Sequence, residues 1–322
     1  TDCFKPAFNY RPKQSAQYAL AISNFDQSEE DPKRYNFGFI ASTDDHTARP
    51  GTGYKQYERR KMTFATGVKS KIWEYKYKAE DPNFPEIPKI TPGESQPDSE
   101  RVSSFVYPGG ILAVHSSGRG KDAIWTALKN KNVYGTSGPR ILLWFDLINS
   151  SQGNLPMGSN VTMSQNPRFI VRAAGSLKQI AGCSSESVDS LSSERLDYLC
   201  AGECYNPSNE RQLIEKIEII KITPQIYAGE AVSPLIQDPW MTIPCNGLSE
   251  CTVEFEDQNY SRDSVYYVRA IQEPTQAING ALLKDRDAFN LCRGSYRTDL
   301  ADDCLSMANE RAWSSPIYVN KP

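Results

Sequence analysis

Residues 35–47 read Tyr-Asn-Phe-Gly-Phe-Ile-Ala-Ser-Thr-Asp-Asp-His-Thr. The apolar part of this stretch ends abruptly at Asp44, and three more polar residues follow it. A brief apolar run of this kind is typical of a buried strand in a parallel sheet. We therefore predict a buried strand at residues 37–42 that carries polar side chains at its carboxyl end.

The segments on either side of this run suggest a repeated order of strand, loop and helix. Residues 12–22 begin with a proline and have apolar side chains at helical spacing, which predicts a short helix. Residues 109–115 form a second apolar run, and a helix with one apolar stripe is predicted at residues 121–129. Five prolines predict an exposed loop over residues 79–100, because proline fixes φ and removes a backbone donor.

The second half of the chain changes to short runs in which apolar and polar residues alternate. Asn, Gly, Ser and Pro separate these runs, as is typical of antiparallel strands joined by turns. The runs cover residues 141–147, 168–173, 216–222, 264–271 and 315–319. We predict two domains, an α/β part over residues 1–140 and an antiparallel β-sandwich-like domain over residues 141–322.

Charge and hydropathy exclude two classes of partner. The 322 residues include 36 Lys and Arg against 39 Asp and Glu, a formal charge of −3. Such a balance offers no basic surface for nucleic acid, so we expect no nucleic-acid partner. No apolar run reaches the roughly 20 residues of a membrane-spanning helix, so we also expect no membrane span.

The eight cysteines indicate disulfide bonds and an oxidising compartment. Two pairs are close in sequence and lie in polar segments, where a disulfide would close a loop: Cys245 with Cys251, and Cys292 with Cys304. We expect at least six of the eight to be bonded and the protein to be extracellular or periplasmic. A zinc site is the alternative, but such sites usually repeat CxxC or include nearby His. The other four cysteines are Cys3, Cys183, Cys200 and Cys204.

Five blocks of the sequence, in the same order, resemble one protein family. They cover residues 37–46, 103–114, 122–128, 133–140 and 310–318. Together they resemble the C-terminal portion of DUF3604, a bacterial family of unknown function in the PHP (polymerase and histidinol phosphatase) metallohydrolase superfamily. The resemblance implies a distorted βα barrel that holds two or three metal ions and ends its ligand set with a DxH pair. Residues 1–140 would form the C-terminal part of that barrel, ahead of the disulfide-bearing sandwich.

Asp44 and His46 match the DxH pair. On an extended strand, residues two apart have side chains on the same face, about 6–7 Å apart, so one ion or two adjacent ions could contact both. The resemblance implies divalent Zn, Mn or Fe, with Asp44 as an oxygen ligand and His46 as a neutral imidazole ligand. Taken alone, residues 44–47 also fit a polar turn that caps a helix. Asp45 points to the opposite face and fits a turn or a contact to a ligand.

Four further residues are candidate substrate contacts. His115 ends the second predicted strand and could face the same site, although a structural His is the alternative. Arg49, Arg119 and Arg140 lie in loops near the predicted strands and could bind an anionic group with their planar guanidinium. Arginine is equally common as a solvated loop cation, so that interpretation stays open for each.

These observations lead to a preferred function and to one rival. The preferred hypothesis is the C-terminal chain of a secreted metal-dependent hydrolase that uses a metal-activated water against a phosphoester, amide or carbamate-like bond of a small molecule. The rival is a non-catalytic extracellular binding or structural protein that retains a hydrolase-like fold. Two buried strands need paired neighbours, so either an upstream segment of the same precursor completes the barrel or residues 1–140 contain more strands than these two. We expect the first, with the upstream segment present as a separate chain.

Overall fold

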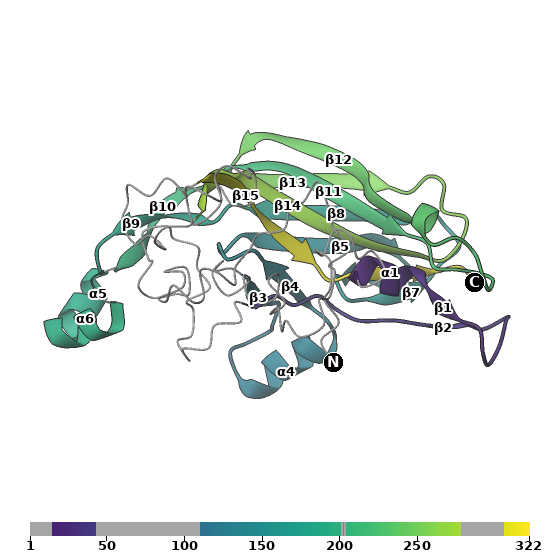
Figure 1. Cartoon of the computed structure of the whole chain (residues 1–322), viewed down its shortest axis with the longest axis horizontal. Coiled ribbons are helices and arrows are strands. Elements are labelled where there is room, and N and C mark those ends of the chain that lie inside the picture. The colour runs from purple at the N-terminus through teal and green to yellow at the C-terminus, as the bar shows by residue number, and fades with distance from the viewer. Residues whose placement is uncertain (1–14, 43–109, 201, 203, 278–305) are drawn as a thin grey trace, which may run out of the picture.

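A computed structural model describes residues 15–42, 110–200, 202, 204–277 and 306–322 of the chain (Figure 1). These residues are mostly β and form two packed antiparallel sheets with short helices at the periphery. Most strands of both sheets come from the second half of the chain, where antiparallel strands were predicted.

The larger sheet has the strand order β12-β11-β14-β15-β4-β3, and β16 extends it from β14 to β7. All its pairings are antiparallel except that of β16 with β7, which is parallel. The bounds of its strands are β3 Ile111–Val114, β4 Val133–Thr136, β7 Asn160–Thr162, β11 Ile214–Ile222, β12 Ile236–Leu248, β14 Ser264–Ala277, β15 Ser306–Ser314 and β16 Ile317–Asn320.

The smaller sheet has the order β13-β8-β5-β6. Its strands are β5 Leu142–Ser150, β6 Gly153–Pro156, β8 Arg168–Ala174 and β13 Glu250–Glu256. Alternate residues of β5 are fully buried, as are Phe169 and Val171 of β8, so the period-two pattern of the sequence marks the face toward the core. The predicted strands at 141–147, 168–173, 216–222 and 264–271 are confirmed within a few residues.

Aromatic rings fill the space between the two sheets. The ring of Phe169 lies 5.3 Å from that of Phe145, 5.0 Å from Phe255 and 4.8 Å from Tyr266, measured between centroids. A second apolar cluster covers the other face of the larger sheet, where Leu20 and Ala21 of α1 pack. Helix α1 spans Ala16–Ala21, and its N-cap Ser15 accepts from the amide of Tyr18, which confirms the predicted helix near residues 12–22.

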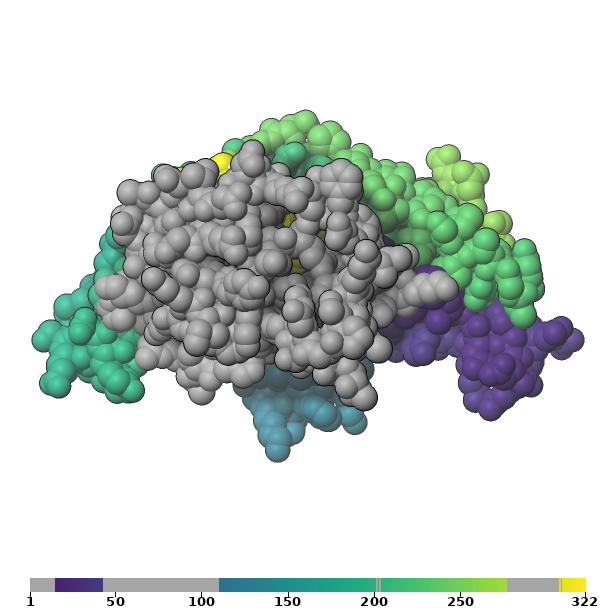
Figure 2. Space-filling view, viewed as in Figure 1, coloured from purple at the N-terminus to yellow at the C-terminus, as the bar shows by residue number. Residues whose placement is uncertain are grey.

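The remaining elements project from the sandwich. They are the hairpin of β1 Ser23–Asn24 and β2 Lys33–Arg34, the helix α4 Lys121–Lys129, the hairpin of β9 Leu177–Ala181 and β10 Tyr205–Arg211, the helices α5 Ser185–Ser190 and α6 Ser193–Cys200, and the 3₁₀ turn η5 Ser233–Leu235. The α5–α6 projection and the β1–β2 hairpin stand at opposite ends of the molecule (Figure 2). Among the described helices, none has the length and apolar character needed to cross a membrane.

The predicted C-terminal part of a PHP-type βα barrel is wrong for the described residues. A barrel of that type is rich in helix, whereas β3 pairs antiparallel with β4, and β4 pairs antiparallel with β15 of the larger sheet. The apolar run at 109–115 is therefore an outer strand of an antiparallel sheet. A short apolar run does not distinguish this position from the centre of a parallel sheet.

The predicted buried strand at residues 37–42 is also wrong, because this segment is extended but belongs to no sheet. The upstream segment was inferred from unpaired barrel strands, and that inference loses its basis now that β3 pairs within the sandwich. Such a segment stays a prediction from the family resemblance alone. The division at residue 140 also stays a prediction, although described strands on both sides of it share one sheet.

Candidate functional site

Residues 35–42, which lead to the predicted metal ligands, are held on the sandwich by side-chain hydroxyl groups. The hydroxyl of Tyr318 accepts from the amide of Phe37 at 2.8 Å and donates to its carbonyl at 2.8 Å. The hydroxyl of Ser315 accepts from the amide of Phe39 at 3.0 Å and donates to the carbonyl of Val133 at 2.6 Å. These hydroxyls satisfy backbone groups that a neighbouring strand would otherwise satisfy, which explains why the segment is extended yet unpaired.

Aromatic packing supports the same segment. The ring of Phe39 meets that of Tyr267 edge to face at a centroid distance of 5.1 Å, and Phe37 lies 5.9 Å from Phe39. Burial raises the pKa of Tyr318 to about 12, while its hydrogen bond to Phe37 acts in the opposite direction. The Tyr318 hydroxyl is therefore protonated at neutral pH and able to donate.

Glycines let residues 38–42 approach the sheet closely. An added Cβ at Gly135 would lie 2.8 Å from the Cβ of Ala41, and one at Gly110 would lie 2.1 Å from the carbonyl oxygen of Ser42. Gly110 also has φ +85°, a conformation that residues with a side chain rarely adopt. Ser42 thus rests on the backbone at the start of β3, two residues before Asp44.

Replacing Gly110 with Ala is expected to destabilise the fold and loosen residues 35–42. The left-handed φ should cost about 1–3 kcal/mol, and the overlap with Ser42 adds to it. Gly153→Ala is the matched control, because φ is +90° there but nothing lies within 4 Å of the added Cβ. Urea unfolding should show the larger loss for Gly110→Ala, and amide exchange should accelerate at Phe37 and Phe39 only in that variant. Equal losses of stability in the two variants would mean that a glycine is needed at position 110 only for its positive φ and not for the close approach of Ser42.

Four of the predicted site residues, Asp44, Asp45, His46 and Arg49, lie outside the described residues. Their roles stay predictions. Of the predicted metal site, the structure describes the anchored segment that leads to it, as far as Ser42.

His115 occupies a structural position at the far end of β3. Its Nε2 lies 2.8 Å from the carbonyl oxygen of Leu143, and its ring packs 5.3 Å from Tyr134 and 5.9 Å from Trp144. A strand rises about 3.3 Å per residue, so His115 lies roughly 16 Å from Gly110, against which Ser42 packs. This geometry favours the structural alternative for His115.

The two described arginines of the predicted site lie on the surface. Arg119 is exposed in the bend before α4, and Arg140 is exposed ahead of β5. A role in binding an anionic substrate stays a prediction for both.

Residues 22–179 match the model of a family described as "Protein of unknown function (DUF3604)". The match runs from the end of α1 through the 35–42 segment, Asp44 and His46 to β9, and it confirms the family resemblance of the sequence blocks in this region. No curated protein and no solved structure matches the chain.

Two disulfides are present in the described residues. Cys245 and Cys251 are bonded, which confirms that predicted pair, and Cys183 is bonded to Cys204. Cys3, Cys292 and Cys304 lie outside the described residues, so the second predicted pair and the expected total of six bonded cysteines stay predictions.

A third sulfur lies beside the Cys183–Cys204 bond, outside the matched part of the chain. The Sγ of Cys200, at the end of α6, is 2.9 Å from that of Cys204, and the ligand atoms of Cys183, Cys200 and Cys204 lie within 4.8 Å of one another. Reduction of the Cys183–Cys204 bond would leave three neighbouring thiols, a ligand type that binds zinc. Sequence reasoning favoured disulfides for these cysteines and did not identify the three-sulfur group.

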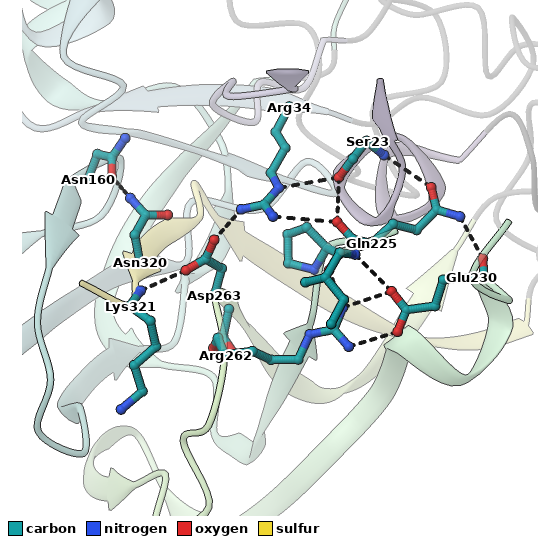
Figure 3. Close-up of polar contacts among 12 residues, drawn as sticks. Ser23, Arg34, Asn160, Gln225, Glu230, Arg262, Asp263, Asn320 and Lys321 are labelled. Carbon is teal, nitrogen blue, oxygen red and sulfur yellow. Dashed lines mark hydrogen bonds and ion pairs between the residues drawn. The ribbon is translucent and has the colours of Figure 1, made fainter. Parts of the chain in front are cut away.

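A cavity of about 590 Å³ lies beside the β1–β2 hairpin and was not predicted from the sequence. Figure 3 shows the guanidinium of Arg34 between Ser23 and Asp263. Arg34 donates to the Ser23 hydroxyl at 3.2 Å and forms an ion pair with Asp263. The carbonyl of Gln225 accepts from the Ser23 hydroxyl at 2.8 Å.

A second ion pair, between Arg262 and Glu230, is connected to this network through Gln225. Arg262 binds both carboxylate oxygens of Glu230, at 2.8 and 3.0 Å, and this hydrogen bonding lowers the pKa of Glu230 (Figure 3). The side chain of Gln225 donates to the carbonyl of Glu230 at 2.6 Å. These groups are engaged in joining the hairpin to the sandwich, so we assign them a structural role.

Proposed function

We propose that this chain is a DUF3604 protein, that it is part of a metal-dependent hydrolase, and that Asp44 and His46 bind its divalent metal ion. The observation that carries the proposal is the anchoring of residues 35–42, because a metal site requires ligands that start from a fixed backbone. Hydroxyl groups and glycine contacts fix this segment up to Ser42. The family match spans both proposed ligands.

The chemistry of the two side chains fits such an ion. Asp44 supplies a carboxylate oxygen and His46 an imidazole nitrogen, a combination suited to Zn, Mn or Fe. A bound ion of this kind would lower the pKa of a coordinated water and so supply a hydroxide nucleophile at neutral pH. Membership of the PHP-like superfamily is part of the proposal, as is a small-molecule phosphoester, amide or carbamate-like substrate.

An extracellular or periplasmic location is the second part of the proposal. The two disulfides support it, because such bonds persist in oxidising compartments and are rare in the cytosol. The disulfide between Cys245 and Cys251, which are 6 residues apart in sequence, closes the turn between β12 and β13, as a structural disulfide does.

Metal analysis of the purified chain tests the proposed ligands. The Cys200→Ser variant serves as the background, so that three thiols cannot bind the ion instead. After incubation with Zn²⁺, Mn²⁺ or Fe²⁺ and desalting, this background should retain about one ion or more per chain. Asp44→Ala and His46→Ala should each retain at least about tenfold less, because loss of a ligand weakens binding at least as much as loss of its supporting partners does.

Two matched variants control for nonspecific effects. Asp31→Ala removes an exposed carboxylate of the β1–β2 loop and should keep the metal. His115→Ala removes the other His and should lower stability but keep the metal, since its ring serves Leu143, Tyr134 and Trp144. Equal metal content in Asp44→Ala and the background would contradict the proposal and favour the non-catalytic alternative.

A further inference from the structure

The sandwich buries a lysine and an aspartate in direct contact. Lys221 belongs to β11 of the larger sheet, and Asp257 directly follows β13 of the smaller sheet. Their side chains are 9% and 1% exposed, and the Nζ of Lys221 donates to the Oδ2 of Asp257. The carboxyl carbon of Asp257 is therefore only one covalent bond beyond the atom that Nζ contacts.

Aromatic rings surround the pair. The Nζ of Lys221 lies 5.3 Å from the ring centroid of Trp240 and 6.0 Å from that of Tyr266. The hydroxyl of Tyr266 donates to the same Oδ2 at 2.5 Å, whereas Oδ1 accepts from the backbone amide of Asn259 at 3.1 Å. Each carboxyl oxygen therefore has its own fixed donor.

The pair brings together the two groups from which an amide is made. Transfer of one proton from the Lys221 ammonium to the Asp257 carboxylate along their hydrogen bond would give a neutral amine beside a carboxylic acid. These are the reactants of amide formation. Two groups held in such an arrangement react as fast as they would in solution with one of them at an effective concentration of about 10⁵–10⁸ M. The apolar surroundings also exclude water, which would favour hydrolysis of the amide.

We propose that Lys221 and Asp257 condense to an intramolecular amide, which is an isopeptide bond. The Nζ of Lys221 attacks the carboxyl carbon, the N–C bond forms, and the bond from that carbon to Oδ2 breaks. Oδ2 leaves as water with two protons that come from the lysine ammonium, so no oxidant, cofactor or second substrate is needed. Tyr266 donates to the leaving oxygen, and the amide of Asn259 stabilises Oδ1, which remains as the carbonyl oxygen.

The bond would join the two sheets covalently. Lys221 lies near the end of β11 that pairs with the start of β12, whereas the Cys245–Cys251 bridge joins β12 to β13 near the other end of β11. The sandwich would then be cross-linked between its sheets at both ends.

The intact mass of the full chain tests the proposal. After denaturation and complete reduction of disulfides, the measured mass should be lower than the mass of the sequence by one water molecule. A proteolytic digest should contain a branched peptide that joins the segment around Lys221 to the segment around Asp257. A mass equal to that of the sequence, with two separate linear peptides, would overturn the proposal.

Two variants sharpen the assignment. Lys221→Arg cannot form the amide and should show the full mass of its sequence, whereas Lys216→Arg, on the same strand, should still lose one water. A loss of water that persists in Lys221→Arg would place the modification elsewhere and contradict the proposal. The mass of the chain with its native sequence decides the question even if Lys221→Arg fails to fold.

Discussion

Replacing Lys221 with Ala should lower the free energy of unfolding by at least about 3–5 kcal/mol, the cost of leaving a buried charge without its partner. Asp257 is 1% exposed, so water cannot replace the partner that the variant lacks. Urea unfolding of the variant and of the chain with the native sequence measures this difference. Lys216→Ala, whose ion pair with Glu218 lies on the same strand but nearer to solvent, should change stability by less than about 1 kcal/mol.

A double variant separates the ion pair from the proposed covalent bond. Changing Lys221 to Met and Asp257 to Leu removes both charges, which is often nearly neutral for a simple buried pair. If the amide has formed, the same change also removes a link that closes a loop of 36 residues, worth about 4 kcal/mol in chain entropy. A stable double variant would therefore agree with an ion pair and disagree with the cross-link.

Phe169→Ala should cost about 3–5 kcal/mol as well, but for a different reason. Phe169 is fully buried and contacts the rings of Phe145, Phe255 and Tyr266, so its removal leaves a cavity between the sheets. Ile180→Ala is the control, because Ile180 is 52% exposed and its loss should change stability by no more than about 0.5 kcal/mol. A loss below about 1 kcal/mol for Phe169→Ala would mean that the core is not packed as described.

The strands in the second half of the chain could be predicted because each has one buried face, which makes apolar and polar residues alternate along the sequence. Leu143, Phe145 and Leu147 alternate with less buried residues, and this period-two pattern survives in any antiparallel sheet. Residues 37–42 show the same apolar character, but there it comes from rings that pack on the outer face of the sheet. Sequence alone does not reveal that Tyr318 and Ser315, which are 281 and 276 residues away from their partners, satisfy the backbone of this segment.

Less of the functional chemistry could be predicted. The Cys245–Cys251 pair was accessible from the sequence because its residues are close along the chain and lie in polar surroundings. Lys221 and Asp257 were not, since each resembles an ordinary charged residue in an alternating strand until the two sheets bring them together. Asp44 and His46 were proposed from a family motif, and the structure adds the anchored segment that leads to them.

The pairing of β4 with β15 has a consequence for the order of folding. Thr136 pairs with Ala312, so the larger sheet cannot be completed until nearly all of the described strands have been synthesised. Contacts between residues so distant in sequence slow folding, because the loop between them must be closed before they contribute. During translation, β3 and β4 would present an unpaired edge for the time that synthesis of the intervening residues takes, at about 5–20 residues per second. A chaperone that covers exposed strand edges should therefore improve the yield of this chain more than one that acts after release from the ribosome.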